Sequence, residues 1–172
     1  MSSHSKPIGE FDLIERFFKA GAQFLCTRSN QTITLGIGDD CAILKPQNNE
    51  EIAVTSDMLV EGRHFFANAN PELLGHKALA VNLSDLAAIG AKPLAFTLAI
   101  ALPKVNEAWL KAFSKDLFSI SEQYFCPLIG GDTTAGPLTI SITALGTIAS
   151  GKAIRPIRGK SWRRHLGFQH CG

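Results

Sequence analysis

NPELLGHKALAVNLSDLAAIG, at residues 70–90, is the stretch of sequence that decides the fold. It opens with a capping asparagine, a proline suited to the first helical position and an acidic residue, and its interior is largely apolar. Gly90 is typical of the residue just past a helix end, and Pro93 follows shortly after it. The stretch therefore predicts a helix from Asn70 to Ile89 that must bury an apolar face against another layer.

Working outward, the apolar patterns predict further elements on both sides of this helix. Before it we expect a helix over Glu10–Ala20 and two strands, Cys41–Leu44 and Ile52–Thr55, joined by a polar turn. After it we expect a strand over Leu94–Leu102, a helix capped by Asn106 that runs to about Tyr124, a short strand Leu128–Ile129 and a long strand Leu138–Ala149. This order predicts a two-layer α+β fold in which helices pack on one face of a mixed sheet.

The composition is that of an ordinary globular protein, with 45% hydrophobic and 19% charged residues among 172. The net charge of +2 hides an asymmetry, because residues 155–172 hold five basic side chains and no acidic one. The remaining 154 residues carry 12 basic and 15 acidic side chains, so their net charge is −3. A negative net charge does not favour nucleic-acid binding and suits the binding of divalent cations.

Other whole-chain features narrow the class of protein further. The chain contains no run of eighteen apolar residues, and its first residues lack the apolar segment of a signal peptide. Its four cysteines form no C-x-x-C pair, so neither a zinc site nor a redox pair is indicated. We therefore expect a protein of the reducing cytoplasm that does not contact a membrane.

Four acidic segments end or interrupt apolar elements, and they are GIGDD at 36–40, TSD at 55–57, Asp85, and GGDTT at 130–134. Each has an ordinary explanation, since glycine and aspartate form turns, Thr-Ser-Asp can cap a helix, and Asp85 can lie on an exposed stripe. All four nevertheless offer oxygen ligands without histidine or cysteine, which is the donor chemistry that magnesium prefers. Together they predict a magnesium-dependent phosphoryl-transfer site.

Asp85 is the most informative of these positions. It lies among small apolar residues on a helix that we expect to be largely buried, and a buried carboxylate is costly unless it is paired or binds a metal. Asn82, one turn earlier, is expected to share its face. The chain contains neither the G-x-x-x-x-G-K-[ST] phosphate loop nor a kinase glycine loop with a strand lysine, so a phosphoryl-transfer site here would use another scaffold.

In order and spacing, several motifs resemble the thiamine-monophosphate kinase family, namely GIGDDCA, TSDMLVEGRHF, KALAVNLSDLAAIGA, LIGGDTT and GKA. The resemblance covers about residues 8–155. That family belongs to the superfamily of aminoimidazole ribonucleotide synthetase and selenophosphate synthetase, whose N-terminal domain fold is implied here. Its members transfer the γ-phosphoryl group of ATP directly to thiamine monophosphate, without a covalent enzyme intermediate.

The resemblance implies roles for individual residues. Magnesium ligands are implied among Asp40, Thr55, Ser56, Asp57, Asp85 and Asp132, and the nucleotide is implied beside Gly131 and Asp132. His64 matches a substrate-contacting histidine, although taken by itself, without the resemblance, the sequence favours an ordinary surface histidine at this position. ATP and thiamine monophosphate are then the ligands, and a second copy of the chain pairs through the sheet. The alternatives are a non-catalytic fragment that binds nucleotide or dimerises, and another phosphotransferase of the superfamily.

The resemblance stops after Arg155, where the family continues toward a second domain that this chain lacks. With suitably chosen codons, residues 156–172 read one base out of frame give RSGAKVGDDIWVSSTV, which is a family-like continuation. We therefore expect a domain over 1–155 followed by an aberrant, disordered tail over 156–172, in a truncated chain of weak or no activity. Resequencing the locus would test this hypothesis.

Overall fold

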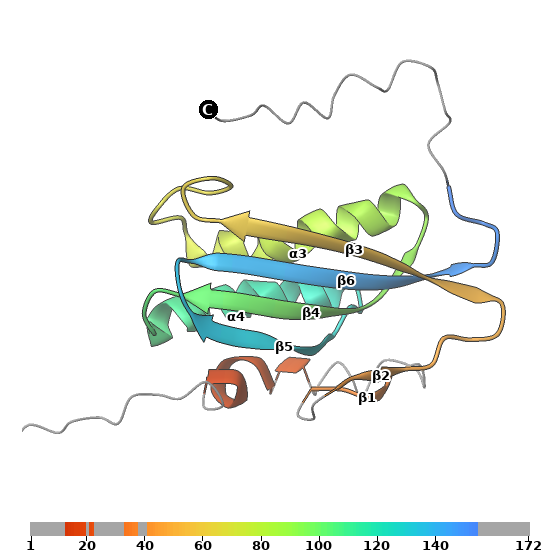
Figure 1. The fold of residues 1–172 in the computed structure, drawn as a ribbon, viewed down its shortest axis with the longest axis horizontal. Helices are drawn as coiled ribbons and strands as arrows, with labels where there is room; N and C mark the ends of the chain where they lie inside the picture. The colour runs from red at the N-terminus through yellow and green to blue at the C-terminus, as the bar shows by residue number, and fades with distance from the viewer. Residues whose placement is uncertain (1–12, 20, 23–32, 38–40, 155–172) are drawn as a thin grey trace, which may run out of the picture.

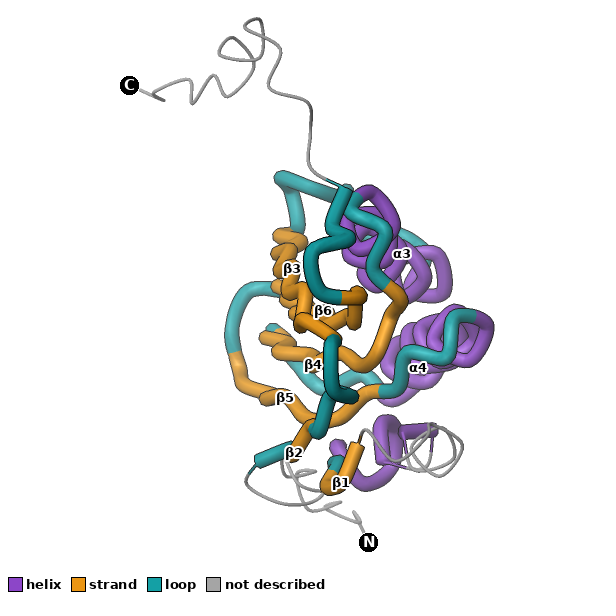
Figure 2. The backbone as a smooth tube through the Cα atoms, turned by 90° about the vertical axis from the view of Figure 1, so that its right-hand side faces the viewer, coloured by secondary structure: helices purple, strands orange, loops and turns teal. Residues whose placement is uncertain are grey.

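The structure is a computed structural model that describes residues 13–19, 21–22, 33–37 and 41–154. Its main body has two layers, a four-stranded sheet and a pair of helices on one face of that sheet (Figures 1 and 2). The strands, in spatial order, are β3 (Glu50–Val60), β6 (Thr139–Ala149), β4 (Lys92–Leu102) and β5 (Leu128–Ala135). The helices are α3 (Pro71–Ala88) and α4 (Glu107–Gln123), and the predicted α+β fold is confirmed.

The sheet is mixed because of one crossover. β6 pairs antiparallel with both β3 and β4, whereas β5 pairs parallel with β4. Parallel neighbours need a long connection, and α4 supplies it between β4 and β5. The outcome is that β3 and β5 are the two edge strands of the sheet.

Both predicted helix starts are confirmed. The Asn70 side chain accepts hydrogen bonds from the backbone N–H groups of Glu72 (2.8 Å) and Leu73 (3.4 Å). The Asn106 side chain accepts one from the N–H of Trp109 (3.1 Å). Each cap satisfies donors that have no partner within the helix, which is why polar residues at these two positions fix where α3 and α4 begin.

The first part of the chain differs from the sequence prediction. The expected helix over Glu10–Ala20 is described only in part, where it forms a short π-helix, η1 (Ile14–Lys19). β2 (Ile43–Leu44) pairs with β1 (Ile33–Leu35), a strand that the sequence analysis missed, and these two form a separate small sheet. The tail at 156–172 lies outside the described residues, and its disorder stays a prediction.

β3 and β5 are longer than predicted because polar residues are included in both. The acidic and hydroxyl residues of β3 are held by eleven consecutive register pairs with β6, from Glu50–Ala149 to Val60–Thr139. The predicted strand over Ile52–Thr55 is therefore only the middle of an eleven-residue strand. Likewise the GGDTT segment at 130–134, which was expected to follow a two-residue strand, lies inside β5. Pairing with a neighbour extends a strand beyond its apolar residues.

The core lies between the sheet and the two helices, and it depends on a close approach of α3 to α4. Fully buried side chains from both layers meet there, among them Leu79, Leu86, Phe96, Phe113, Leu117 and Ile142. A Cβ atom at Gly75 would lie 2.2 Å from the backbone oxygen of Phe113, so only glycine allows this distance between the helices. Among the described residues, no helix is long and apolar enough to cross a membrane.

We predict that Gly75→Ala destabilises the protein by about 1–3 kcal/mol, because the added methyl group must push α3 away from α4. This cost opposes the gain of about 1 kcal/mol that alanine brings to a helix interior. His76→Ala, at the exposed neighbouring position, is the control and should be close to neutral. Denaturant unfolding of the three proteins measures the difference, and a Gly75→Ala variant as stable as the parent would contradict the packing argument.

Candidate functional site

The central feature of the candidate site is a hydrogen bond between the sheet and α3. The Thr55 hydroxyl on β3 donates to Oδ2 of Asp85 on α3, at 2.8 Å. Thr55 and Asp57 are next to Ala144 and Ile142 of β6, both buried on the helix side, so Thr55 and Asp57 also point toward that side. Two of the predicted motifs, whose members Thr55 and Asp85 are 30 residues apart in sequence and lie in different layers, thus meet at the β3 edge.

The donor chemistry of this group fits a magnesium ion. A hydroxyl and two carboxylates supply oxygen ligands only, and Asp85 and its neighbours leave the edge open to solvent rather than enclosing it. Magnesium retains several waters and is commonly bound through one or two carboxylates together with substrate phosphates. Thr55, Asp57 and Asp85 would hold such an ion, and the hydrogen bond from Thr55 orients the Asp85 carboxylate.

Asp85 is exposed, and the expectation that it is a buried carboxylate is wrong. Asn82 occupies the buried environment instead, where its Nδ2 donates to the Ala78 carbonyl at 3.2 Å. Its Oδ1 has no hydrogen-bond partner in the described part of the chain. Side chains that are three residues apart on an α-helix point in directions about 60° apart around its axis. Asn82 can therefore face the core while Asp85 lies at the margin of the core.

Ser56 points away from the other residues of its motif. Its hydroxyl lies 2.9 Å from the Thr143 hydroxyl of β6, on the sheet face opposite the helices. Successive side chains of a strand alternate between faces, so Ser56 cannot share a metal with Thr55 and Asp57 without a change in the strand. As a magnesium ligand, Ser56 stays a prediction that this arrangement does not favour.

Asp132 lies at the other edge of the sheet. It is next to Ala99 in the β4–β5 register, and its own Oδ1 accepts a hydrogen bond from the Thr133 N–H at 2.9 Å. Three strand spacings separate β5 from β3, a lateral distance of about 14 Å. Within the ranges that the structure describes, no three histidine, cysteine or acidic side chains are close enough to hold a metal. Asp40 lies outside the described residues.

The two glycines before Asp132 have different structural roles. A Cβ atom at Gly131, where φ is +153°, would lie 1.8 Å from the Leu98 carbonyl oxygen, so the close approach of β4 and β5 requires glycine. At Gly130 an added Cβ would meet nothing within 4 Å. The packing of β4 against β5 therefore accounts for glycine at position 131. At position 130 glycine leaves the backbone without a side chain, so a ligand or partner can approach it.

The loop after β3 fixes the orientation of His64. The Val60 backbone N–H donates to His64 Nδ1 at 3.0 Å, so the neutral ring carries its proton on Nε2. The Lys77 ammonium donates to the His64 carbonyl at 2.8 Å and ties the loop to α3. Gly62, at φ +77°, allows the tight turn in which its N–H bonds the Phe65 carbonyl. His64 thus presents an N–H donor suited to an anion.

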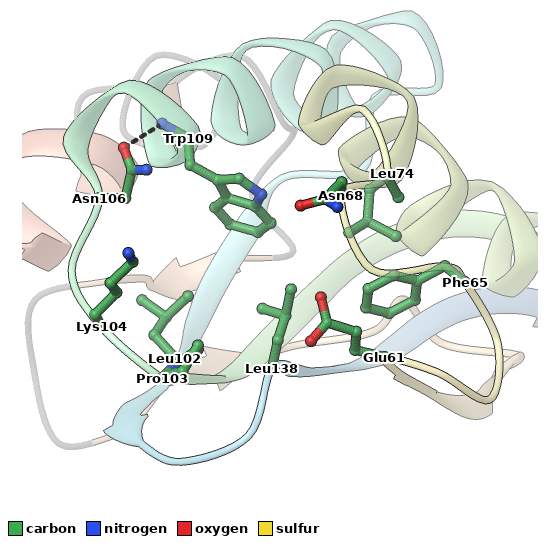
Figure 3. Close-up of a pocket in the computed structure, with 11 residues that line it drawn as sticks. Glu61, Phe65, Asn68, Leu74, Leu102, Pro103, Lys104, Asn106, Trp109 and Leu138 are labelled. Atoms are coloured by element: carbon green, nitrogen blue, oxygen red, sulfur yellow. Dashed lines mark hydrogen bonds between the residues drawn. The ribbon is translucent and has the colours of Figure 1, made fainter.

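A cavity of about 220 Å³ lies beyond this loop, at the ends of β3 and β4 and the starts of both helices (Figure 3). It is lined by Glu61, Phe65, Asn68, Ala69, Leu74, Leu102, Pro103, Lys104, Asn106, Trp109 and Leu138. No sequence motif indicates this cavity. The apolar residues among these read as ordinary core positions, and the polar ones carry no motif, so only the fold shows that they converge.

Cys126 is not an activated nucleophile. Burial raises the pKa of the Cys126 thiol to about 12, so this group remains protonated at physiological pH. Cys41 is exposed and immediately follows the predicted glycine loop. A site of hydroxyls, carboxylates and an oriented histidine suits positioning and charge neutralisation rather than covalent catalysis.

Comparison with known proteins finds one family and a consistent group of relatives. The family described as AIR synthase related protein, N-terminal domain, matches residues 38–148, a range that includes every residue of the predicted site. Thiamine-monophosphate kinase of Salmonella typhimurium is 47% identical over 147 residues, which are 86% of this chain and 44% of that protein. The chain thus spans less than half the length of the curated relatives that it matches.

Solved structures agree with the sequence comparison. The crystal structure of thiamine-monophosphate kinase from Stenotrophomonas maltophilia K279a superposes with a TM-score of 0.73 at 47% identity, over 86% of this chain and 45% of that chain. The structure of AaThiL complexed with AMPPCP and TMP superposes with a TM-score of 0.57 at 28% identity, over 86% of this chain and 45% of that one.

We predict that Thr55→Val weakens Mg²⁺ binding in the presence of ATP by about tenfold or more, because Asp85 loses the group that orients it. Ser56→Ala, one residue along, should leave Mg²⁺ affinity unchanged, since its hydroxyl faces Thr143. Isothermal titration of both variants measures the difference. An equal or larger loss in Ser56→Ala would place the metal on the opposite face of the sheet.

Proposed function

We propose that this chain is the ATP- and magnesium-binding part of a thiamine-phosphate kinase. The chain belongs to the family described as AIR synthase related protein, N-terminal domain. The 47% identity to thiamine-monophosphate kinases over 86% of the chain carries the proposal. The reaction is transfer of the ATP γ-phosphoryl group to thiamine monophosphate, which gives thiamine diphosphate and ADP, a step of thiamine diphosphate biosynthesis. The free cysteines suit a cytoplasmic protein.

In this proposal the described residues act by positioning. Thr55, Asp57 and Asp85 would hold magnesium, which supplies charge neutralisation at the phosphates when it is bound. The Nε2–H of His64 donates a hydrogen bond to the phosphate of the accepting substrate. Because the acceptor phosphate is itself the nucleophile, no side chain needs to form a covalent intermediate, and the chain aligns two anions that otherwise repel one another.

The same geometry supports a homodimer. Asp57 and Asp132 lie on opposite edge strands of one chain, too far apart to share one nucleotide phosphate. Both helices lie on one side of the sheet (Figure 2). The other face is partly apolar, with Ile52, Val54 and Met58 exposed by 37%, 62% and 56%. A second copy packed on this face would bury these apolar side chains, and Asp132 would lie at the interface because the sheet register places it on the same face as Met58.

A second function, that of a protein which binds nucleotide or pairs with a second copy, is favoured by the exposed apolar side chains Ile52, Val54 and Met58 on β3. This chain would then bind nucleotide, or pair with a second copy, without efficient turnover. The two functions differ in the rate of product formation and not in ATP binding.

We expect the purified chain to bind ATP in the presence of Mg²⁺ and to form little or no thiamine diphosphate from thiamine monophosphate. A chain in which the frame after residue 155 is restored should show measurable turnover. Product analysis by chromatography, alongside equilibrium binding of ATP, separates the two functions. Asp85→Asn should abolish Mg²⁺-dependent ATP binding in both chains, and failure of the parent chain to bind ATP at all would contradict the proposed function.

We predict that Val54→Glu converts the dimer to a monomer, because it places a charge among the exposed apolar side chains of the open sheet face. Val105→Glu makes the same change at another exposed position, 44% exposed in the β4–α4 connection, and should leave the dimer intact. Sedimentation velocity gives the oligomeric state. A monomeric parent chain, or a Val54→Glu variant that stays dimeric, would contradict pairing through the sheet.

A further inference from the structure

A buried side-chain amide on α3 is left with one unsatisfied oxygen. Asn82 has 0% of its surface exposed, and its Nδ2 donates to the Ala78 carbonyl at 3.2 Å. This hydrogen bond fixes which end of the amide is the oxygen, because the reverse placement would bring two oxygen atoms together. The oxygen, Oδ1, has no hydrogen-bond donor among the residues that the structure describes. A buried polar atom without a partner raises the free energy of the fold and therefore requires an explanation.

The location of this amide follows from how α3 runs over β3. The helix runs back along the strand in the opposite direction (Figure 1), and the hydrogen bond from Thr55 places Asp85 opposite that residue. Asp57 lies two residues further along β3, a distance of about 6.6 Å at the rise of a strand. On an α-helix the same distance corresponds to about four residues. Asp57 is therefore opposite the turn of α3 that contains Val81 and Asn82.

Asp57 and Asn82 both belong to the space between the sheet and α3. The register partner of Asp57 is Ile142 of β6, which is buried on the helix side, and Asn82 lies on the buried face of α3 with Leu79 and Leu86. Asp57 makes no hydrogen bond or ion pair with any residue that the structure describes. A carboxylate and an amide oxygen are both acceptors, so neither can satisfy the other. A cation that brings its own hydrogen-bond donors would satisfy both.

We propose that Oδ1 of Asn82 is part of the magnesium site, where it accepts a hydrogen bond from a water molecule that the ion retains. The inference rests on the proposed function, in which Thr55, Asp57 and Asp85 hold the ion. Magnesium keeps several waters when it binds to a protein, and the hydrogen atoms of these waters need acceptors. Asn82 is then a positioning residue, because it orients a water of the ion without contacting the phosphates. Its unsatisfied oxygen is explained as an acceptor that is used only when the ion is bound.

Two substitutions at position 82 separate this role from a purely structural one. Asn82→Leu keeps the branched shape and removes the polar atoms, so without magnesium it should be at least as stable as the parent, and its Mg²⁺ affinity should fall by about tenfold. Asn82→Asp keeps an acceptor oxygen and buries a charge, so it should be less stable than the parent without magnesium and should gain more stability than the parent when Mg²⁺ is added. A residue with only a structural role would change stability equally with and without the ion.

Urea unfolding of the full 172-residue chain, in EDTA and at increasing MgCl₂ concentrations, measures both quantities, because a ligand that binds only the folded state stabilises it. Asn82→Ala removes the same oxygen without adding volume, and it replaces Asn82→Leu in the experiment if the leucine variant does not fold. Ser114→Ala is the matched control. Ser114 is a buried polar residue of α4 whose hydroxyl donates to the Lys111 carbonyl at 3.3 Å, and this variant should keep the parent's response to Mg²⁺.

The same measurements with Mg²⁺ alone and with Mg²⁺ and ATP separate this inference from the proposed function. If the parent responds to Mg²⁺ and ATP, and the leucine or alanine variant at position 82 responds equally, the assignment of Asn82 is wrong and the proposed function stands. If the response to Mg²⁺ depends on Asn82 but ATP does not bind, the assignment holds and the proposed kinase function fails. A parent chain whose stability responds to Mg²⁺ under neither condition overturns both.

Discussion

The pairing of β3 with β6 is the constraint on which the rest of the site depends. β3 is an edge strand rich in polar residues, and eleven consecutive register pairs hold its whole length against β6. Because side chains alternate along a strand, this single register decides that Thr55 and Asp57 face α3 and that Ser56 faces away. A shift of the β3–β6 register by one residue would exchange the side chains that face α3 with those that face away, and it would separate Thr55 from Asp85.

The second part of the site depends on where α3 lies above the sheet, which the core determines. Gly75 lets α3 approach α4, and the two helices together cover one face of the sheet through buried residues such as Leu79 and Leu117. With the helix fixed in this way, Asp85 lies at its exposed margin, within hydrogen-bonding distance of β3. An exposed carboxylate needs no buried partner for stability, so its orientation by Thr55 is consistent with a role in binding a ligand.

The sequence was most informative where a local chemical signal determines structure. The capping residues Asn70 and Asn106 define the helix starts, and the α+β fold follows from the order of apolar patterns. Strand lengths were harder to predict, because the polar ends of β3 and β5 are held by neighbours distant in sequence. For the same reason the burial of Asn82 in place of Asp85, and the cavity around Trp109, depend on tertiary contacts that no local pattern encodes.

In the homodimer that we propose, the sheet order would also have an electrostatic consequence. Carboxylates gathered around one point repel each other when no cation is bound, and this repulsion raises the free energy of the folded chain. With Asp57 and Asp132 on opposite edges, a single chain keeps these two charges about 14 Å apart. Association of two chains would bring such groups together, and magnesium with nucleotide would then neutralise them. Assembly and ligand binding would in this way be coupled by the same electrostatic interaction.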